Sequence, residues 1–190
     1  MEFSKVKSGF LLIFLIGILI SCSVKYVPVP TKNITISEGY AIQKQEDYVF
    51  AVSNKYWIRE PQNLTDYFTT FHISVKNKSS EKIEVAAADI SLLDASGTQF
   101  DAVGTDYVLE LLVPEEIAYD HYLEVPEEHR QIWENWREAK KYLMSDAFNF
   151  GTILPGATKS GFVFFPKLKS VNKKCSIVFK GKTINFEREN

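Results

Sequence analysis

Apolar and polar side chains alternate most clearly in the segment YFTTFHISVKN. One side carries Tyr67, Phe71, Ile73 and Val75 with Thr69 between them, and the other carries Thr70, His72, Ser74 and Lys76. A period of two residues is typical of a β-strand that presents one face to a core. The sequence therefore predicts a half-buried strand over 67–76.

Shorter segments of the same kind follow, separated by turn residues. NKSSEK (Asn77–Lys82) precedes a second expected strand over Ile83–Leu93, and DASG (Asp94–Gly97) precedes a third over Thr98–Val103. Towards the C-terminus, LPGAT turns into KSGFVFFP, and CSIVF is joined through KGK to TINFE. Short strands at this spacing, with Gly and Pro between them, indicate an antiparallel sandwich or barrel.

One segment, Pro114–Asn149, departs from the strand pattern and is too long for a plain hairpin loop. Its apolar residues recur at spacings of four, three and four, as on one face of a helix: Ile132, Trp136, Ala139 and Leu143. Pro126, followed by two glutamates, is typical of a helix N-terminus. The sequence predicts a helix over Glu127–Ser145, within an insertion between two strands.

The segments FTTFHISVKNKSSEKIEVAAADISLLDASGTQF and GTILPGATKSGFVFFP resemble immunoglobulin-like domains of unknown function that recur in bacterial lipoproteins. Those domains share a strand that ends in an NK turn, a LLDxxG hairpin and the pattern LxPGxxxxGxVxFP. The resemblance covers about Tyr48–Asn190. It implies a mainly β fold, an immunoglobulin-like antiparallel β-sandwich, which here carries the helical insertion. It brings no catalytic residues.

An apolar run near the N-terminus ends just before a cysteine. Lys5 and Lys7 precede Phe10–Ile20, and a helix of that length covers roughly 16 Å, well short of the ~30 Å hydrocarbon core of a bilayer. The run therefore predicts a secretory signal instead of a membrane span. Leu19-Ile20-Ser21-Cys22 resembles the lipobox of bacterial lipoproteins, which implies cleavage after Ser21 and a diacylglycerol on the Cys22 thiol. An uncleaved signal anchor and a secreted protein with an unrelated cysteine are the alternatives.

These patterns divide the chain into a signal peptide over 1–21, a lipidated N-terminus and tether over 22–39, and the sandwich over 40–190 with its insertion at about 114–149. Pro28 and Pro30 favour extended chain, so we expect the tether to be a spacer of roughly 30 Å. In lipoproteins of two-membrane bacteria, a Ser after the acylated Cys, as Ser23 here, usually goes with the outer membrane. The lipobox resemblance therefore favours a place in the cell envelope, on the outer membrane facing the periplasm.

Composition narrows the classes of partner. The chain has 22 Lys and Arg against 24 Asp and Glu, so no basic excess is present to bind nucleic acid. If Cys22 carries lipid, Cys175 has no disulfide partner, and its strand context predicts a small buried side chain. The three His and one remaining Cys show no zinc-ligand spacing. We expect no metal and no cofactor.

The candidate partner-binding residues are aromatic and lie in the insertion: Trp133, Trp136 and Tyr142. Trp and Tyr anchor interfaces because they bury a large area at little entropic cost. Two other interpretations stay open. In the first, these side chains only cover the sandwich. In the second, a basic face made by Trp133, Arg137, Lys140 and Lys141 lies on lipid headgroups, although Glu127, Glu128, Glu134 and Glu138 dilute its charge.

Catalytic signals in the sequence are weak. It contains no Gly-x-Ser-x-Gly, His-Glu-x-x-His or Gly-rich phosphate loop. The acid–base candidates are His72 and the group formed by Asp120-His121, Glu110, Glu115 and Glu116. We expect a membrane-anchored envelope lipoprotein that binds or scaffolds an envelope protein and is not an enzyme; the alternative is a small extracytoplasmic hydrolase. A His beside an acid in a concave pocket would favour the hydrolase, and an exposed apolar patch around Trp133 would favour partner binding.

Overall fold

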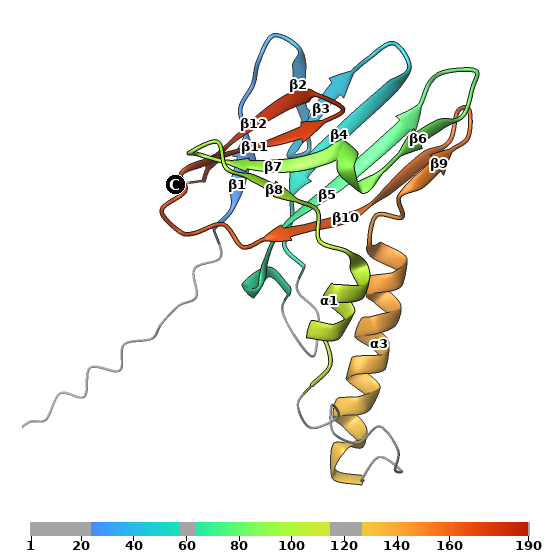
Figure 1. The fold of residues 1–190 in the computed structure, drawn as a ribbon, viewed down its shortest axis with the longest axis vertical. Helices are drawn as coiled ribbons and strands as arrows, with labels where there is room; N and C mark the ends of the chain where they lie inside the picture. Colours follow the sequence, from blue (N-terminus) through green and yellow to red (C-terminus); the bar gives the residue numbers. More distant parts are fainter. Residues whose placement is uncertain (1–23, 58–63, 115–126, 190) are drawn as a thin grey trace, which may run out of the picture.

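Two antiparallel five-stranded sheets pack face to face in the part of the chain that the computed structural model describes, residues 24–57, 64–114 and 127–189 (Figure 1). The first sheet has the order β1 (Tyr26–Pro28), β12 (Lys182–Arg188), β11 (Lys174–Phe179), β7 (Ile90–Asp94) and β8 (Gln99–Asp101). The second has the order β10 (Thr158–Pro166), β5 (Phe68–Asn77), β4 (Tyr48–Asn54), β3 (Tyr40–Lys44) and β2 (Ile34–Ser37). A separate pair joins β6 (Ile83–Val85) to β9 (Gly151–Ile153). The fold class predicted from the sequence, a mainly β, immunoglobulin-like sandwich with a helical insertion, is confirmed.

The main core lies between the two sheets. Phe50 of β4 stacks on Phe179 of β11 with ring centroids 4.1 Å apart, and Phe71 of β5 meets Phe186 of β12 at 5.1 Å. All four rings are buried. Such pairs bring two inner faces together and supply most of the apolar burial that stabilises a sandwich.

The alternation predicted for the strand over 67–76 agrees with β5. Phe71, Ile73 and Val75 are fully buried in the main core. Tyr67 is one exception, since it precedes the strand and is 51% exposed. Thr70 is another, since it lies on the side predicted to be polar and is buried. The predicted pairing through KGK is also correct, since β11 and β12 form a hairpin whose turn residues Lys180 and Gly181 both have positive φ, as two-residue hairpin turns require.

The strand expected over Ile83–Leu93 is in fact two strands with a break. The 3-10 turn η2 (Ala87–Asp89) separates β6 from β7. The Asp89 carboxylate accepts a hydrogen bond from the Ala86 N–H at 2.8 Å, and the Asp89 N–H donates to the Ala86 carbonyl at 3.0 Å. This closed turn lets the chain leave β9 and join the first sheet.

The prediction of a free spacer over 22–39 is wrong for most of its length. β1 pairs with β12, in the register Tyr26↔Arg188 to Pro28↔Phe186, and β2 pairs with β3. The proline-containing stretch is extended as expected, but Pro28 ends an edge strand, where a missing N–H is tolerated. The sandwich therefore begins at Tyr26 and not at residue 40.

In the described part of the insertion between β8 and β9, the chain forms two α-helices. The predicted helix over Glu127–Ser145 agrees with the 3-10 turn η3 (Glu127–His129) followed by α3 (Arg130–Asp146). A shorter helix, α1 (Thr105–Leu111), precedes it and was not predicted. We call α1 and α3 together the helical arm. Figure 1 shows the arm projecting from one end of the sandwich.

Candidate functional site

Both ends of the helical arm are hydrogen-bonded to one edge strand. The Val103 N–H, just before α1, donates to the carbonyl of Phe164 at 2.8 Å. The Phe148 N–H, just after α3, donates to the carbonyl of Phe162, also at 2.8 Å. Because both acceptors belong to β10, the arm enters and leaves at neighbouring points of the second sheet, which fixes its base to the sandwich.

A second apolar cluster joins the arm to the outer face of that sheet. The arm contributes Val108, Leu112, Ala139 and Leu143, and the sandwich side contributes Trp57, Leu64, Phe68 and Phe164; all eight residues are buried. On α3, the buried residues among those described are Ala139 and Leu143, both in its C-terminal half. The N-terminal half of α3 therefore extends beyond the sandwich, as Figure 1 shows.

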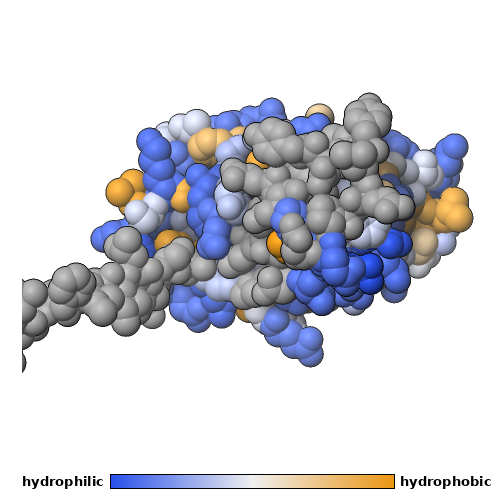
Figure 2. Space-filling model, turned by 90° about the horizontal axis from the view of Figure 1, so that it is seen from below, coloured by the Kyte–Doolittle hydropathy of each residue, from blue (hydrophilic) through white to orange (hydrophobic). Residues whose placement is uncertain are grey.

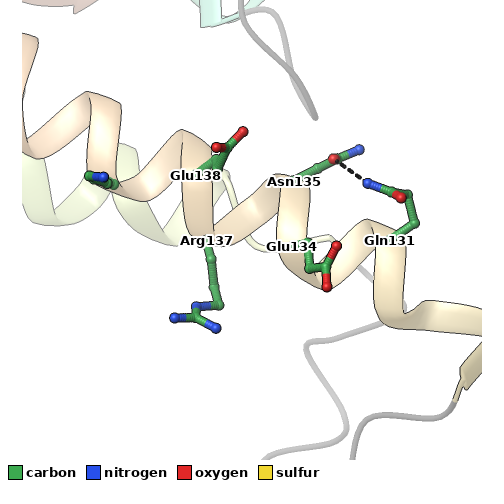
Figure 3. Close-up of a pocket in the computed structure, with 6 residues that line it drawn as sticks. Gln131, Glu134, Asn135, Arg137 and Glu138 are labelled. Atoms are coloured by element: carbon green, nitrogen blue, oxygen red, sulfur yellow. Dashed lines mark hydrogen bonds between the residues drawn. The ribbon is translucent and has the colours of Figure 1, made fainter.

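The charges of α3 divide between two flanks. An α-helix turns about 100° per residue, so residues spaced by three and four lie on one side. One side carries Trp133, Arg137, Lys140 and Met144, which we call the basic flank. About a third of a turn away, another side carries Gln131 and Glu138, the acidic flank, and Figure 3 shows Arg137 pointing away from both.

Cations and indole rings are in contact on the basic flank. The Trp133 and Trp136 rings meet edge to face with centroids 6.1 Å apart. The Arg137 guanidinium lies 4.6 Å from the centre of the Trp133 ring, and the Lys140 ammonium lies 5.4 Å from that of Trp136. Both distances fall within the range of cation–π attraction, so the two indoles and the two cations form one surface strip.

The structure brings together two of the three predicted partner-binding residues. Trp133 and Trp136 are adjacent and half-buried. Tyr142 follows Trp133 by nine residues, or two and a half turns, and therefore lies on the opposite side of the helix, where it is 38% exposed. Cys22, the predicted lipidation site, lies outside the described residues.

The sequence predicts that four glutamates reduce the positive charge of the basic face, and the structure corrects this for Glu138. Figure 3 shows Glu138 pointing away from Arg137, whereas Glu134, three residues before Arg137, lies on the same side of the helix as Arg137 in that view. Glu127 forms an ion pair with Arg130, at the start of α3. Lys141 lies at the border between the two flanks, beside Glu134 and Glu138. The turn of the helix, applied to the sequence, would have found this separation.

A hollow of about 570 Å³ lies over α3 and is lined by Gln131, Glu134, Asn135, Arg137, Glu138 and Lys141. Figure 3 shows that these side chains do not converge on one point; Gln131 donates to Asn135 at 2.9 Å along the helix. Groups of both charges that point apart do not make an acid–base pair. The hollow is a solvated helix surface.

The described histidine of the acid–base candidates, His72, pairs with a phenol. Its Nδ1 lies 3.0 Å from the Tyr40 hydroxyl, and its ring meets Phe162 edge to face at 5.2 Å. Desolvation lowers the pKa of His72, and the nearby Lys55 lowers it further. Asp120, His121, Glu115 and Glu116 lie outside the described residues, and Glu110 is exposed on α1. Among the described residues, the Asp146 carboxylate also acts on His72, and it raises the pKa of His72 against the other two causes.

Cys175 is packed in the main core, as its strand context predicts. It is 3% exposed, and burial raises the pKa of its thiol to about 12. A thiol in that state is unreactive. Among the residues that the structure describes, no group of three His, Cys, Asp or Glu side chains could hold a metal ion. In the same part of the chain, no helix is long and apolar enough to cross a bilayer.

The sequence analysis missed α1 and the attachment of the arm to β10. The signal for α1 was present, because Val108 and Leu112 are four residues apart and both are buried against α3. Gly104 supplies the helix N-cap position. The attachment to β10 has no local signal, since it depends on backbone groups that meet only in the folded chain.

Comparison with known proteins gives neither a family nor an activity. No protein family model matches the chain, and no curated protein matches it. Among solved structures, the chain is similar to MPT63, a secreted protein from Mycobacterium tuberculosis, with 8% identity and a TM-score of 0.34 over 85% of this chain and 98% of that one. It is also similar to a functionally unknown protein from Listeria monocytogenes EGD-e, with 16% identity and a TM-score of 0.32 over 80% of this chain and 70% of that one.

Proposed function

We propose that the protein is an envelope lipoprotein, anchored through acyl chains on Cys22, that binds or scaffolds a protein at the membrane surface. The support comes from the leader, in which Lys5 and Lys7, the apolar run Phe10–Ile20 and Leu19-Ile20-Ser21-Cys22 follow in the order of a lipoprotein signal. One acyl chain gives marginal membrane binding and two or more give stable anchoring. Periplasmic exposure on the outer membrane, suggested by Ser23, is part of the proposal.

The structural observation that best supports the proposal is the position of β1. Tyr26 begins the first sheet only four residues after Cys22, and its N–H donates to the buried Asn54 side chain at 2.8 Å. Its hydroxyl donates to the Asn172 carbonyl at 2.9 Å. An anchor on Cys22 would thus be tied to a rigid sheet through a few residues, so the sandwich would be held against the membrane without a long spacer.

Binding is assigned to the arm because it is the element that projects from the sandwich (Figure 1). Figure 2 views the molecule from the end on which the arm projects. The described surface visible there is mainly hydrophilic, with scattered hydrophobic residues. A polar, projecting surface suits a reversible contact better than a permanent apolar interface.

The test replaces each of the two cysteines in turn and follows the protein in cell fractions. The variant Cys22→Ala removes the acceptor thiol, and Cys175→Ala, in the core, is the matched control. We expect wild type and Cys175→Ala to be processed and to sediment with membranes, whereas Cys22→Ala remains an unprocessed precursor or is released. Membrane retention of Cys22→Ala at the normal mature mass would contradict the proposal.

A further inference from the structure

The basic flank combines three groups that suit the headgroup region of a membrane. Arg137 and Lys140 are exposed cations, Trp133 and Trp136 carry amphipathic rings beside them, and Met144 is 63% exposed at the end of the strip. Trp residues are enriched at membrane–water interfaces, and cations attract anionic phospholipids. Glu138 points away from this strip, and Glu134, which lies beside Arg137, leaves the two cations of the strip in excess of one carboxylate.

The start of the described chain lies at the base of the arm. Val24 lines a small hollow together with Thr65, Phe68 and Lys167. Phe68 belongs to the second apolar cluster, which also contains Leu143 of α3. Figure 1 shows β1 beginning at the same end of the sandwich from which the arm projects. A chain of two residues spans at most about 7 Å, so an anchor on Cys22 would be held within that distance of Val24.

These positions limit where the arm can go when Cys22 is anchored. α3 has 17 residues and is therefore about 25 Å long. Its base and the start of the described chain lie at the same end of the sandwich (Figure 1). An arm that projects from the anchored end has no free space below it, so it must lie along the bilayer surface with one flank towards the lipid. The flank that can make this contact favourably is the basic one.

We propose that the basic flank of α3, formed by Trp133, Arg137, Lys140 and Met144 and supported by Trp136, docks on an anionic phospholipid surface. The docked arm is a second, electrostatic contact beside the lipid on Cys22, and it fixes the orientation of the sandwich on the membrane. The acidic flank and the far end of the sandwich then face the aqueous space, where a protein partner binds. This inference rests on the proposed lipid anchor.

The experiment uses the full lipidated protein, reconstituted into vesicles whose lipids carry brominated acyl chains. One set contains phosphatidylglycerol and phosphatidylethanolamine, and the other contains only neutral phosphatidylcholine. Bromine quenches tryptophans near the membrane, so Trp133 and Trp136 report docking, while the buried Trp57 contributes a constant background. The test variant carries Arg137→Gln with Lys140→Gln.

The matched control carries Lys44→Gln with Lys82→Gln, which changes the net charge by the same amount. Both lysines are exposed, and both lie near the end of β5 that is distant from Phe68 and the arm, where the Lys78 N–H donates to the Asp47 carbonyl. Each basic side chain near an anionic surface shifts a binding equilibrium about fivefold, so we expect the test variant to lower the docked-to-undocked ratio about 30-fold and the control to leave it unchanged.

If the arm docks, tryptophan quenching is stronger in the anionic vesicles than in the neutral ones, and the test variant loses this difference. The difference is also lost in about 1 M NaCl, where the Debye length is about 3 Å. Equal quenching in both vesicle types, with lipid on Cys22 confirmed by mass, would overturn docking alone. Absence of lipid on Cys22 would overturn the anchor and docking together. Crosslinking from position 133 to an envelope protein, without dependence on anionic lipid, would assign the flank to a protein partner and overturn docking.

Discussion

Gly161 of β10 lies where the arm returns to the sandwich, and its replacement tests how tightly the arm is attached. A Cβ at position 161 would lie 2.5 Å from the Phe148 nitrogen, 2.6 Å from the Ala147 carbonyl carbon and 2.7 Å from the Phe148 Cα. These are backbone atoms, which cannot rotate away as a side chain does. The variant Gly161→Ala must therefore push the chain at 147–148 away from the edge strand.

The size of the effect follows from the geometry. Moving the Phe148 nitrogen from 2.5 Å to an ordinary contact of 3.4 Å takes a shift of about 0.9 Å. The same nitrogen donates to the Phe162 carbonyl at 2.8 Å, and a shift of that size away from β10 breaks this hydrogen bond. Overpacking costs about 1–3 kcal/mol and a lost hydrogen bond about 1 kcal/mol, so we expect the free energy of unfolding to fall by roughly 2–4 kcal/mol.

Thermal and urea unfolding measure this loss, and for a domain of this size it corresponds to a decrease in Tm of roughly 5–15 °C. Amide hydrogen exchange at Phe148 should accelerate as well. The matched control is Gly104→Ala, because a Cβ there meets no atom within 4 Å. If Gly161→Ala unfolded at the same temperature and urea concentration as Gly104→Ala, the close approach of the arm to β10 would be refuted.

Three further predictions concern single side chains. Leu143→Ala removes a fully buried side chain from the second apolar cluster and should lower the free energy of unfolding by about 2–5 kcal/mol. Met144→Ala, at an exposed position, should change the free energy of unfolding by less than about 0.5 kcal/mol. Equal urea midpoints for the two variants would contradict this prediction. The Cys175 thiol, with its pKa raised to about 12, should react with a maleimide only after unfolding, and rapid labelling of the native protein would show that it is accessible. Burial lowers the pKa of His72 below 6.5, so as the pH falls through that value the unfolded state takes up a proton that the folded state does not. The free energy of unfolding should therefore fall with the pH, and it should fall less in His72→Gln. An NMR titration midpoint of His72 at or above 6.5 would contradict the lowered pKa.

The parts of the fold that the sequence predicted are those set by local periodicity. Phe71, Ile73 and Val75 alternate because they line the face of β5 that the main core covers, and Ala139 and Leu143 recur because α3 packs one side on the sheet. In each case the pattern and the burial arise from the same repeat of the backbone. The strand and the helix were therefore recognisable without their partners.

The errors lie where distant residues decide the structure. Tyr26–Pro28 is a strand because it pairs with Phe186–Arg188 at the other end of the chain, and no local pattern reports that pairing. The break between β6 and β7 depends on one carboxylate, that of Asp89, in an otherwise strand-like segment. The helix α1 is too short to be stable alone and is held by Val108 and its neighbours in the second apolar cluster.

The candidate site was predictable in composition but not in arrangement. Trp133 and Trp136 were recognised as interface residues, and the structure places them together. Tyr142 was grouped with them by proximity in the sequence, although nine residues of helix place it on the opposite side. The same rotation turns Glu138 away from Arg137 and Lys140, whereas Glu134 stays beside Arg137.

The central claim is that acyl chains on Cys22 hold the sandwich at the membrane, and the N-terminal tryptic peptide tests it most directly. Trypsin cleaves after Lys7 and Lys25. For the protein extracted from membranes, the account predicts a peptide Cys22–Lys25 that carries the mass of a diacylglyceryl group on the cysteine. Recovery of the unmodified peptide Ser8–Lys25, uncleaved between Ser21 and Cys22, would contradict it.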